Sequence, residues 1–474
     1  MDKKIKILYE SSILNNFDSN SNSRTGIYWT AFNLLKHLAK RPDVELYLYS
    51  NDYEKTKKFI KHVSPDIQKL SLYYDDVKSM DVVFSPYLKI HDKIRNTRIN
   101  CFTLLHDCIP LIFPLYFDKN GTSWFTQMFN AINEKDYYFS NSEYTKSDFL
   151  KFSTKIDKLK ITTIPLSTNQ PYQPNKNEEK LKEVKEKYNI PHDKKYLFSL
   201  CSLEPRKNLI RSVKTFIEFI NKNKIDDLVF VLGGSAWSGF ISKFEKEVPD
   251  YQKYQDKIIK AGYVDDADME TLYSNAEWFV YTSQYEGFGM PPLEAMKCGC
   301  PVITSNNSSL PEVVGDAGIM IDWDSDEQHI QSYEKYYFDK EFKNTMAQKG
   351  KERSLLFSWE KAAEIMVNQF KSCPQNQKRL SLILKDELFN PNRCKIFIKL
   401  FKAIPFLKIQ KKPNQMKVFL FNVLPILKFK QGNRFKTWRL LGLPVFKIKS
   451  VKKGRAQKYY ILGLEMLKIS KKTL

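Results

Sequence analysis

The chain has 474 residues, which is too many for one hydrophobic core, so several domains are expected. Its 42% hydrophobic and 14% aromatic content, with 16 Gly and 21 Pro, excludes a disordered, collagen-like or low-complexity protein. The formal net charge of +22 is local, because residues 375–474 hold 25 Lys and Arg against 3 Asp and Glu, which leaves 51 of each sign in residues 1–374.

The seven cysteines are an odd number without Cys-x-x-Cys spacing, so the sequence predicts neither a disulfide framework nor a zinc site. The first ten residues lack the apolar core of a signal peptide and predict a first strand instead. The longest uncharged runs, 108–117 and 418–427, are well short of the roughly 20 residues that a membrane helix needs. We therefore expect a cytoplasmic chain without transmembrane segments.

From the N-terminus onward, β-branched apolar runs alternate with segments of helical period, which is typical of a parallel sheet with crossover helices. A helix is expected over residues 27–39, where apolar residues recur on one face. Strands are expected at 5–10, 44–50, 81–85, 100–105, 138–142 and 161–165. Residues 1–168 thus predict one Rossmann-like α/β domain.

A polar stretch over residues 169–179, with two prolines and no apolar period, predicts a linker to a second domain of the same type. Strands are expected at 196–200, 228–232, 258–263, 278–282, 302–305 and 318–321, and helices at 209–221, 267–275, 327–355 and 358–371. The second domain is thus expected over 169–372, closed by its last two helical stretches. Two tandem doubly wound domains leave a cleft between them, and open α/β sheets bind ligands beyond the carboxyl ends of their strands.

The basic tail, residues 373–474, contains a repeat. Its copies recur at intervals of 20, 19 and 21 residues, at 404–410, 424–430, 443–449 and 464–470. Each copy ends in an alternation of apolar residues and lysine, which places the two kinds on opposite faces of a short strand. The tail therefore predicts a small basic β-repeat module.

The strongest chemical signal lies in the stretch 285–304, which follows an expected strand and opens a helix with proline in its first turn. Gly287 and Gly289 allow backbone amides to come close to a ligand, and the helix start offers unpaired N–H groups to an anion. Glu294 could accept two hydroxyl protons from a ribose, while Glu286 could face a sugar. Taken singly, Glu294 could merely complement the helix dipole, and Glu286 could merely end a strand.

This stretch, with Cys-Gly-Cys-Pro-Val-Ile-Thr-Ser-Asn at 298–306 and Ser-Leu-Pro-Glu-Val-Val-Gly-Asp-Ala-Gly at 309–318, resembles the donor domain of family-four glycosyltransferases. Three further segments share the resemblance. They are Arg-Thr-Gly-Ile at 24–27 with Asn-Leu-Leu at 33–35, His-Asp-Cys-Ile-Pro at 106–110, and Ser-Leu-Glu-Pro-Arg-Lys-Asn at 202–208. The resemblance covers residues 1 to about 370 and implies retaining enzymes of the GT-B fold. In that fold, 1–168 is expected to be the acceptor domain and 169–372 the nucleotide-sugar donor domain. It also implies that Arg206 and Lys207 bind the donor diphosphate and that His106 reaches the donor sugar.

Elementary chemistry agrees with these roles. Transfer of a sugar from a nucleotide passes through an oxocarbenium-like state while negative charge builds on the diphosphate. Arg206 and Lys207, between a strand and a helix, could take that charge. The amides expected to help are those of Gly287, Phe288, Gly289 and Met290. Glu294 is expected to bind the ribose and Glu286 the donor sugar, together with His106, whose imidazole the adjacent Asp107 could orient.

Three Asp-x-Asp triplets, at 266–268, 322–324 and 324–326, precede expected helices. Capping of the helix N-termini by aspartate explains them more simply than a metal site. We expect no essential metal and no cofactor, because the nucleotide sugar is a substrate.

The leading interpretation is a retaining, metal-independent hexosyltransferase. It would move a hexose or deoxyhexose from a GDP- or UDP-linked sugar to a bacterial surface glycan such as lipopolysaccharide or capsule, on a lipid-linked acceptor. The basic tail at 375–474 could hold the chain on the anionic inner face of the cell membrane.

Alternatives are a nucleotide-sugar epimerase or phosphorylase on the same fold, or a non-catalytic glycan-binding subunit. The tail could also be a solvated basic appendage. Binding of nucleic acid is the weakest alternative, because the neutral body offers no base-reading element.

Overall fold

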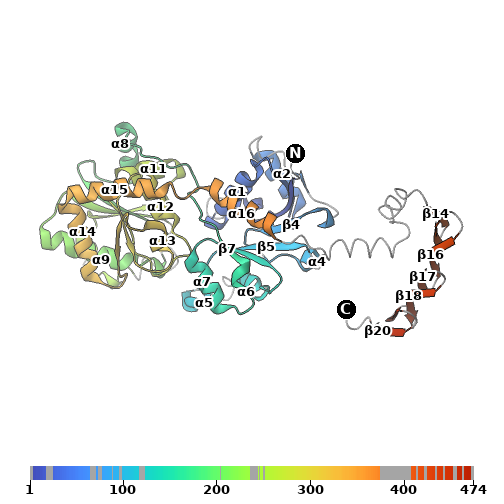
Figure 1. Ribbon diagram of the computed structural model, residues 1–474. Helices are drawn as coiled ribbons and strands as arrows, with labels where there is room; N and C mark the ends of the chain where they lie inside the picture. The colour runs from blue at the N-terminus through green and yellow to red at the C-terminus, as the bar shows by residue number, and fades with distance from the viewer. Residues whose placement is uncertain are drawn as a thin grey trace. The chain divides into compact units, whose positions relative to one another are not determined.

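The computed structural model in Figure 1 divides the chain into two compact units, Met1–Pro374 and Gln375–Leu474. In the first unit it describes residues 4–17, 25–63, 71–72, 77–87, 89–95, 99–116, 123–202, 204–234, 244, 246–248 and 251–373. In the second unit it describes the seven strands given below.

The first domain of the larger unit is built on a parallel sheet of order β3-β2-β1-β4-β5-β6-β7. Its strands are β1 (Ile5–Glu10), β2 (Val44–Tyr49), β3 (Ser71–Leu72), β4 (Val82–Ser85), β5 (Asn100–Leu105), β6 (Tyr137–Ser140) and β7 (Ile161–Thr163). Its α-helices are α1 (Gly26–Ala39), α2 (Tyr53–His62), α4 (Asp92–Arg95), α5 (Ile109–Ile112), α6 (Ser123–Asn130) and α7 (Glu143–Phe152). The strand order reverses between β1 and β4, which makes the sheet doubly wound.

The second domain has a parallel sheet of order β10-β9-β8-β11-β12-β13. Its strands are β8 (Lys195–Leu200), β9 (Leu228–Gly233), β10 (Ile258–Gly262), β11 (Phe279–Tyr281), β12 (Val302–Ser305) and β13 (Ile319–Ile321). Its α-helices are α8 (Glu178–Lys187), α9 (Leu209–Asn223), α11 (Asp266–Asn275), α12 (Met290–Lys297), α13 (Leu310–Val314), α14 (Asp326–Phe338) and α15 (Lys340–Ser354). Here the strand order reverses between β8 and β11, as the doubly wound pattern requires.

Local sequence explains these elements. All six residues of β9 are buried, as expected for a central parallel strand covered on both faces. The helical stretch expected over 327–355 is two helices, because Asp339 ends α14 and its side chain caps α15 by accepting a hydrogen bond from the amide of Phe342. The two-residue strand β3 was not expected, since two residues carry no period.

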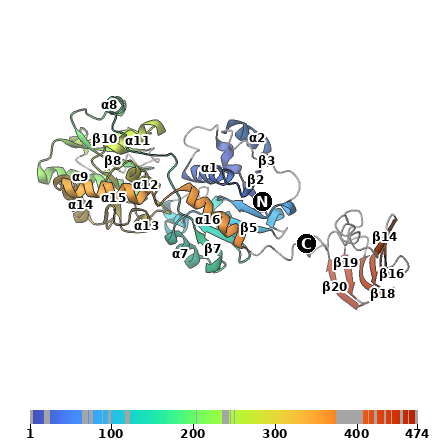
Figure 2. The ribbon, with the colours of Figure 1, turned by 45° about the horizontal axis from the view of Figure 1, so that its top comes forward.

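Helix α16 (Trp359–Ser372) lies against the first domain, beside α1 (Figure 2). The ring of Phe370 contacts Phe84, Phe102 and Phe139 of the first sheet, with centroids 6.2, 4.7 and 5.6 Å away. The expectation that residues 358–371 close the second domain is therefore wrong. The apolar face of α16 is buried on the first sheet, so the last helix of the larger unit packs against its N-terminal domain.

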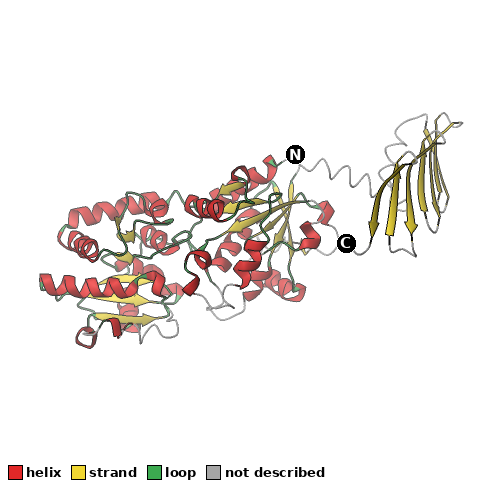
Figure 3. Ribbon diagram, turned by 90° about the horizontal axis from the view of Figure 1, so that it is seen from below, coloured by secondary structure: helices red, strands yellow, loops and turns green. Residues whose placement is uncertain are grey.

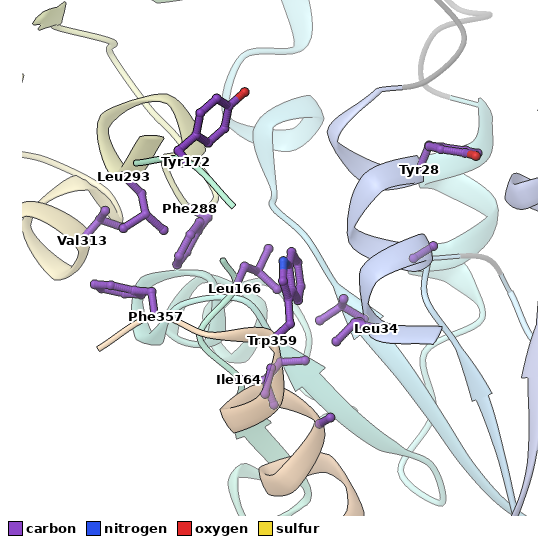
Figure 4. Close-up of a cluster of buried hydrophobic side chains, with 14 of the residues drawn as sticks. Tyr28, Leu34, Ile164, Leu166, Tyr172, Phe288, Leu293, Val313, Phe357 and Trp359 are labelled. Carbon is purple, nitrogen blue, oxygen red and sulfur yellow. The ribbon is translucent and has the colours of Figure 1, made fainter. Parts of the chain in front are cut away.

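The chain passes between the two domains twice, near residues 167–168 and near residues 357–359, and these two segments contact each other. Trp359 donates its indole hydrogen bond to the carbonyl of Thr168 at 2.8 Å, and Ser167 donates to the carbonyl of Phe357 at 3.0 Å. One cluster of buried apolar side chains continues through this point from one domain to the other. Figure 4 shows Leu166 and Trp359 within it. The two domains therefore share a core at their junction.

The second unit is an antiparallel sheet whose strands follow one another in chain order, drawn as yellow arrows in Figure 3. The strands are β14 (Leu407–Lys412), β15 (Gln415–Leu420), β16 (Leu424–Gly432), β17 (Phe435–Leu440), β18 (Leu443–Val451), β19 (Ala456–Ile461) and β20 (Leu464–Ser470). The sequence repeats at 424–430, 443–449 and 464–470 fall on β16, β18 and β20. Residues 404–406 of the first repeat lie outside the described residues, and 407–410 fall on β14. The return strands β15, β17 and β19 lack the repeated signature and were not expected.

Among the described residues, no helix combines the length and the apolar character that a membrane crossing requires.

Candidate functional site

A cavity of about 640 Å³ lies between the two domains and is lined by both. The first domain contributes the start of α1, the loop after β5 and Asn141 after β6. The second contributes the loop after β8, the end of β11 and the start of α12. All the site residues that the sequence predicted line this one cavity: His106, Arg206, Lys207, Glu286, Gly287, Phe288, Gly289, Met290 and Glu294. Of the segment 24–27, residues 25–27 line it too, while Arg24 lies outside the described residues.

A cluster of buried charges forms the wall of the cavity near β8 and β11. Glu286 accepts hydrogen bonds on Oε1 from Nη1 of Arg206 at 2.9 Å, from Nζ of Lys207 at 2.7 Å and from the hydroxyl of Tyr281 at 3.1 Å. Nη2 of Arg206 also binds Glu204 at 2.6 Å. Arg206 and Glu286 are only 6% and 8% exposed, so these pairs are shielded from water. The cations therefore depend on the two glutamates for charge compensation.

The same contacts set the ionisation of Glu286. Burial alone would raise its pKa, but the charges of Arg206 and Lys207 outweigh burial and lower the pKa to about 2. Glu286 is thus an anion at any physiological pH. It can accept hydrogen bonds and cannot donate a proton.

Glu294 sits in a different environment on α12. It is 4% exposed, and the hydroxyl of Tyr273 donates a hydrogen bond to its Oε2 at 2.9 Å. Burial raises the pKa of Glu294 to about 7, and the hydrogen bond from Tyr273 offsets only part of that rise. The two glutamates of this segment therefore differ in charge state around neutral pH.

His106 is held by backbone and not by the adjacent carboxylate. Its Nε2 lies 2.7 Å from the carbonyl oxygen of Pro86, which can only accept, so Nε2 carries the proton and Nδ1 is left as an acceptor. Asp107 instead accepts a hydrogen bond from the amide of Ile109 at 2.9 Å. The expectation that Asp107 orients the imidazole is therefore wrong. Burial lowers the pKa of His106 to about 4, so the ring is neutral.

Gly287 brings the two domains into direct contact at the cavity. A Cβ on this residue would lie 2.3 Å from the carbonyl oxygen of His106, so a side chain has no room there. Its own carbonyl accepts hydrogen bonds from Ser142 at 2.8 Å and from Thr145 at 3.1 Å, both at the start of α7. Gly289 precedes α12 with φ of 117°, a conformation that favours glycine. Each glycine is thus required by local geometry.

Several buried polar atoms around the cavity lack a hydrogen-bond partner within the described part of the protein. Those that belong to cavity-lining residues are Thr30 Oγ1, Asn141 Oδ1, Asn169 Oδ1 and Arg206 Nε. Buried polar groups are normally paired, so unpaired ones that gather around one cavity indicate a polar ligand. Arg206 Nε is a donor beside the charge cluster and suits an anionic group.

The aspartate triplets do not cap helices as expected. Asp268 is buried and pairs with Lys180 at 3.0 Å, and it accepts a hydrogen bond from Tyr188 at 2.9 Å. The cap of α14 is Ser325, whose hydroxyl accepts from the amide of Gln328. Within the residues that the structure describes, no group of three His, Cys, Asp or Glu side chains is arranged to hold a metal ion.

Sequence reasoning missed four side chains that hold the site together: Asn141, Glu204, Tyr273 and Tyr281. Tyr281 ends β11 and Asn141 follows β6, so their positions at strand carboxyl ends were a usable signal. Glu204 lies inside the Glu-Pro-Arg-Lys-Asn segment, two residues before Arg206. Tyr273 gave no signal, because its contact with Glu294 depends on how α11 packs against α12.

Comparisons with known proteins agree with this geometry. A family model described as glycosyl transferases group 1 matches residues 181–353. The O-antigen chain mannosyltransferase B of Escherichia coli is 30% identical over 275 residues, which are 57% of this chain and 69% of that protein. The serotype-specific mannosyltransferase WbdA of Escherichia coli is 24% identical over 314 residues, which are 66% of this chain but only 37% of that protein.

Solved structures share the fold. HepE of Anabaena, in complex with UDP and glucose, superposes with a TM-score of 0.57 at 14% identity over 78% of this chain and 100% of that one. WaaG, a glycosyltransferase involved in lipopolysaccharide biosynthesis, superposes with a TM-score of 0.55 at 13% identity over the same shares. These likenesses concern the fold alone, and they confirm the expected GT-B arrangement of two doubly wound domains.

Replacing Glu286 by glutamine tests the charge cluster. The change leaves Arg206 and Lys207 short of a buried counter-charge and should destabilise the chain by about 3–5 kcal/mol. Because the pKa of Glu286 is about 2 and its usual value is 4.5, this stabilisation is present above pH 4.5 and lost as the pH falls towards 2. Calorimetric Tm values should therefore differ between wild type and variant at neutral pH, and the difference should shrink in acid.

The matched control is Asp326→Asn, which removes the carboxylate partner of the half-exposed Arg211. An exposed pair contributes less than about 1 kcal/mol, so Tm should hardly move. Equal effects of the two substitutions would contradict the buried cluster.

Proposed function

We propose, from the premise that the chain belongs to the group 1 glycosyl transferases, that it transfers a hexose, with mannose the first candidate, from a nucleoside diphosphate sugar to a bacterial surface glycan. The observation that carries this proposal is the buried cluster of Arg206, Lys207 and Glu286 in the wall of the interdomain cavity. Mannose comes from the names of the two E. coli relatives described above, which are both mannosyltransferases.

The donor diphosphate belongs beside Arg206 and Lys207. Within the described residues, Nε of Arg206 has no hydrogen-bond partner, and the start of α12 lies at the same cavity with the amides of residues 287–290. Charge-assisted bonds and preorganised amides stabilise the charge that grows on a departing diphosphate. These cations therefore suit the leaving group.

The donor sugar belongs between Glu286 and His106. Glu286 is a fixed anion that accepts hydrogen bonds from sugar hydroxyls, and neutral His106 offers Nδ1 as a second acceptor from the other domain. The ribose belongs at Glu294, one turn into α12. This order places the bond that breaks, between the sugar C1 and the phosphate oxygen, next to the cations.

We further propose front-face transfer with retention of the anomeric configuration and without an essential metal. The acceptor oxygen forms its bond to C1 on the face from which the diphosphate departs, and the acceptor proton goes to a phosphate oxygen. Arg206 and Lys207 supply the positive charge that a metal ion supplies elsewhere. The acceptor would then bind on the side of the cavity that residues of the first domain line.

A thermal-shift panel tests donor binding. GDP, UDP, dTDP and ADP are each added, with and without EDTA, to wild type and to Glu294→Ala. One nucleotide at about 100 times its Kd should stabilise the wild type by roughly 2.7 kcal/mol, which is readily seen as a higher Tm. The variant should lose the shift, whereas Glu341→Ala, an exposed change on α15, should keep it.

If EDTA abolishes the wild-type shift, metal independence fails. If no nucleotide shifts the wild type at all, the catalytic proposal fails, and glycan binding without catalysis becomes the account to test.

The basic unit at 375–474 supports a second part of the proposal, docking on an anionic membrane where a lipid-linked acceptor would lie. Strand register sets Lys428 directly opposite Lys417 and Arg439. It also sets Lys458 opposite Lys449 and Lys468. Basic residues that occupy neighbouring register positions make this sheet strongly positive in sequence, which favours an anionic surface as its partner. Each Lys or Arg near such a surface contributes on the order of 1 kcal/mol.

Cosedimentation with vesicles tests this docking. The full chain should pellet with vesicles that contain phosphatidylglycerol and should stay in the supernatant with pure phosphatidylcholine. Added salt should release it, because the attraction is electrostatic. A chain that ends at Ser372 should not pellet with either lipid, and equal pelleting of the two chains on anionic vesicles would refute the proposal.

A further inference from the structure

We propose that Tyr273 is a positioning residue that holds the Glu294 carboxylate, as an anion, for the two ribose hydroxyls of the donor nucleotide. The inference rests on the proposed function, because it deepens the role given to Glu294. It concerns a side chain that belongs to α11 and is absent from the cavity lining.

The contact is a hydrogen bond of ordinary length that is shielded from water. The Tyr273 hydroxyl donates to Oε2 of Glu294 at 2.9 Å, and the two residues are 0% and 4% exposed. Glu294 also lines the cavity, so its carboxylate joins the buried phenol on one side to the ligand space on the other. With Oε2 engaged, Oε1 is the oxygen that remains for hydroxyl groups.

The Tyr273 side chain has a fixed conformation, because its ring packs against three other aromatic rings. Its centroid lies 5.3 Å from that of Phe198, 5.2 Å from Phe279 and 6.0 Å from Tyr172, all in edge-to-face geometry. Phe198 and Phe279 belong to β8 and β11, the central strands of the sheet in the second domain. The position of the hydroxyl is thus set by the core of the domain.

No cation hydrogen-bonds Glu294 within the described residues, in contrast to Glu286. The titratable groups that act on Glu294 from the elements around it are Tyr172, Asp266, Tyr273, Lys297 and Cys298. Lys297 turns its ammonium group to the hydroxyls of Ser167 and Thr168, at 2.9 and 3.1 Å. Tyr273 is therefore the hydrogen-bond donor on which the anionic form of Glu294 depends.

The sign of the effect follows from this arrangement. A hydrogen bond donated to a carboxylate favours the charged form and lowers its pKa. The pKa of Glu294 is about 7 with the bond in place, because burial raises it more than the bond lowers it. Loss of the phenol raises the pKa further, so at neutral pH more of the protein carries a protonated Glu294. A protonated carboxyl accepts two ribose hydroxyls less well than the anion does.

Titration calorimetry on the full chain tests the inference with GDP, UDP, dTDP and ADP as probes. Tyr273→Phe removes the hydroxyl and keeps the ring. With whichever probe binds the wild type, affinity should fall about five-fold at pH 7, the fall expected from a one-unit rise in pKa, and less than two-fold at pH 8.5. The 2′,3′-dideoxy form of the same nucleotide should bind wild type and variant equally, since it offers no ribose hydroxyls.

The matched control is Tyr336→Phe. Tyr336 is equally buried in the same domain and donates its hydroxyl to the carbonyl of Val302 at 3.0 Å, away from the cavity. The Tyr336→Phe variant should bind the nucleotide with the affinity of the wild type at both pH values.

The outcomes separate the two claims. If none of the four probes binds the wild type, the proposed function fails. Three other results would show that the positioning role is wrong while donor binding stands. Tyr273→Phe could bind the probe as tightly as the control variant does, or it could lose as much affinity for the dideoxy nucleotide as for the parent nucleotide. Its affinity could also stay equally reduced at pH 8.5.

Discussion

The compensation of two buried cations is the constraint on which the rest of the structure depends. Arg206 and Lys207 are nearly inaccessible to water, and charges in such a place are tolerated only beside well-placed counter-charges. Glu286 and Glu204 supply those charges. The loops that carry them follow β8 and β11, which are neighbours where the strand order reverses. A doubly wound sheet thus delivers opposite charges to one spot and leaves a cavity beside them.

Glu286 and Glu294 show how the surroundings of two similar side chains give them different charge states. Glu286 lies against cations and is an anion throughout the physiological range, whereas Glu294 lies against a phenol and titrates near neutral pH. Under the proposed function, the permanent charge of Glu286 would lie beside the donor sugar. Glu294, which titrates near pH 7, would then make the affinity for the donor depend on pH. Each carboxylate is held by a tyrosine from outside the stretch 285–304: Tyr281 donates to Glu286, and Tyr273 donates to Glu294.

Sequence alone predicted the two α/β domains and the membership of the cavity wall, because strand period, glycines and a dense motif are local signals. It failed where long-range packing decides. Helix α16 has an unremarkable amphipathic pattern that suits either domain, and only the ring contacts of Phe370 place it on the first sheet. The orientation of His106 is set by the carbonyl of Pro86, 20 residues away, and not by the carboxylate next to it. The tail strands β15, β17 and β19 were missed for a different reason, because they lack the repeat signature although each pairs with its neighbours in the chain.

A crystal structure of the chain with an intact nucleoside diphosphate sugar is the most direct test of the central claim. The account predicts the diphosphate within hydrogen-bond distance of Lys207 and of Arg206 Nε, the sugar hydroxyls on Glu286 and His106, and the ribose hydroxyls on Glu294. A diphosphate bound away from Arg206 and Lys207, with their pairs to Glu286 undisturbed and no ligand atom near them, would contradict it.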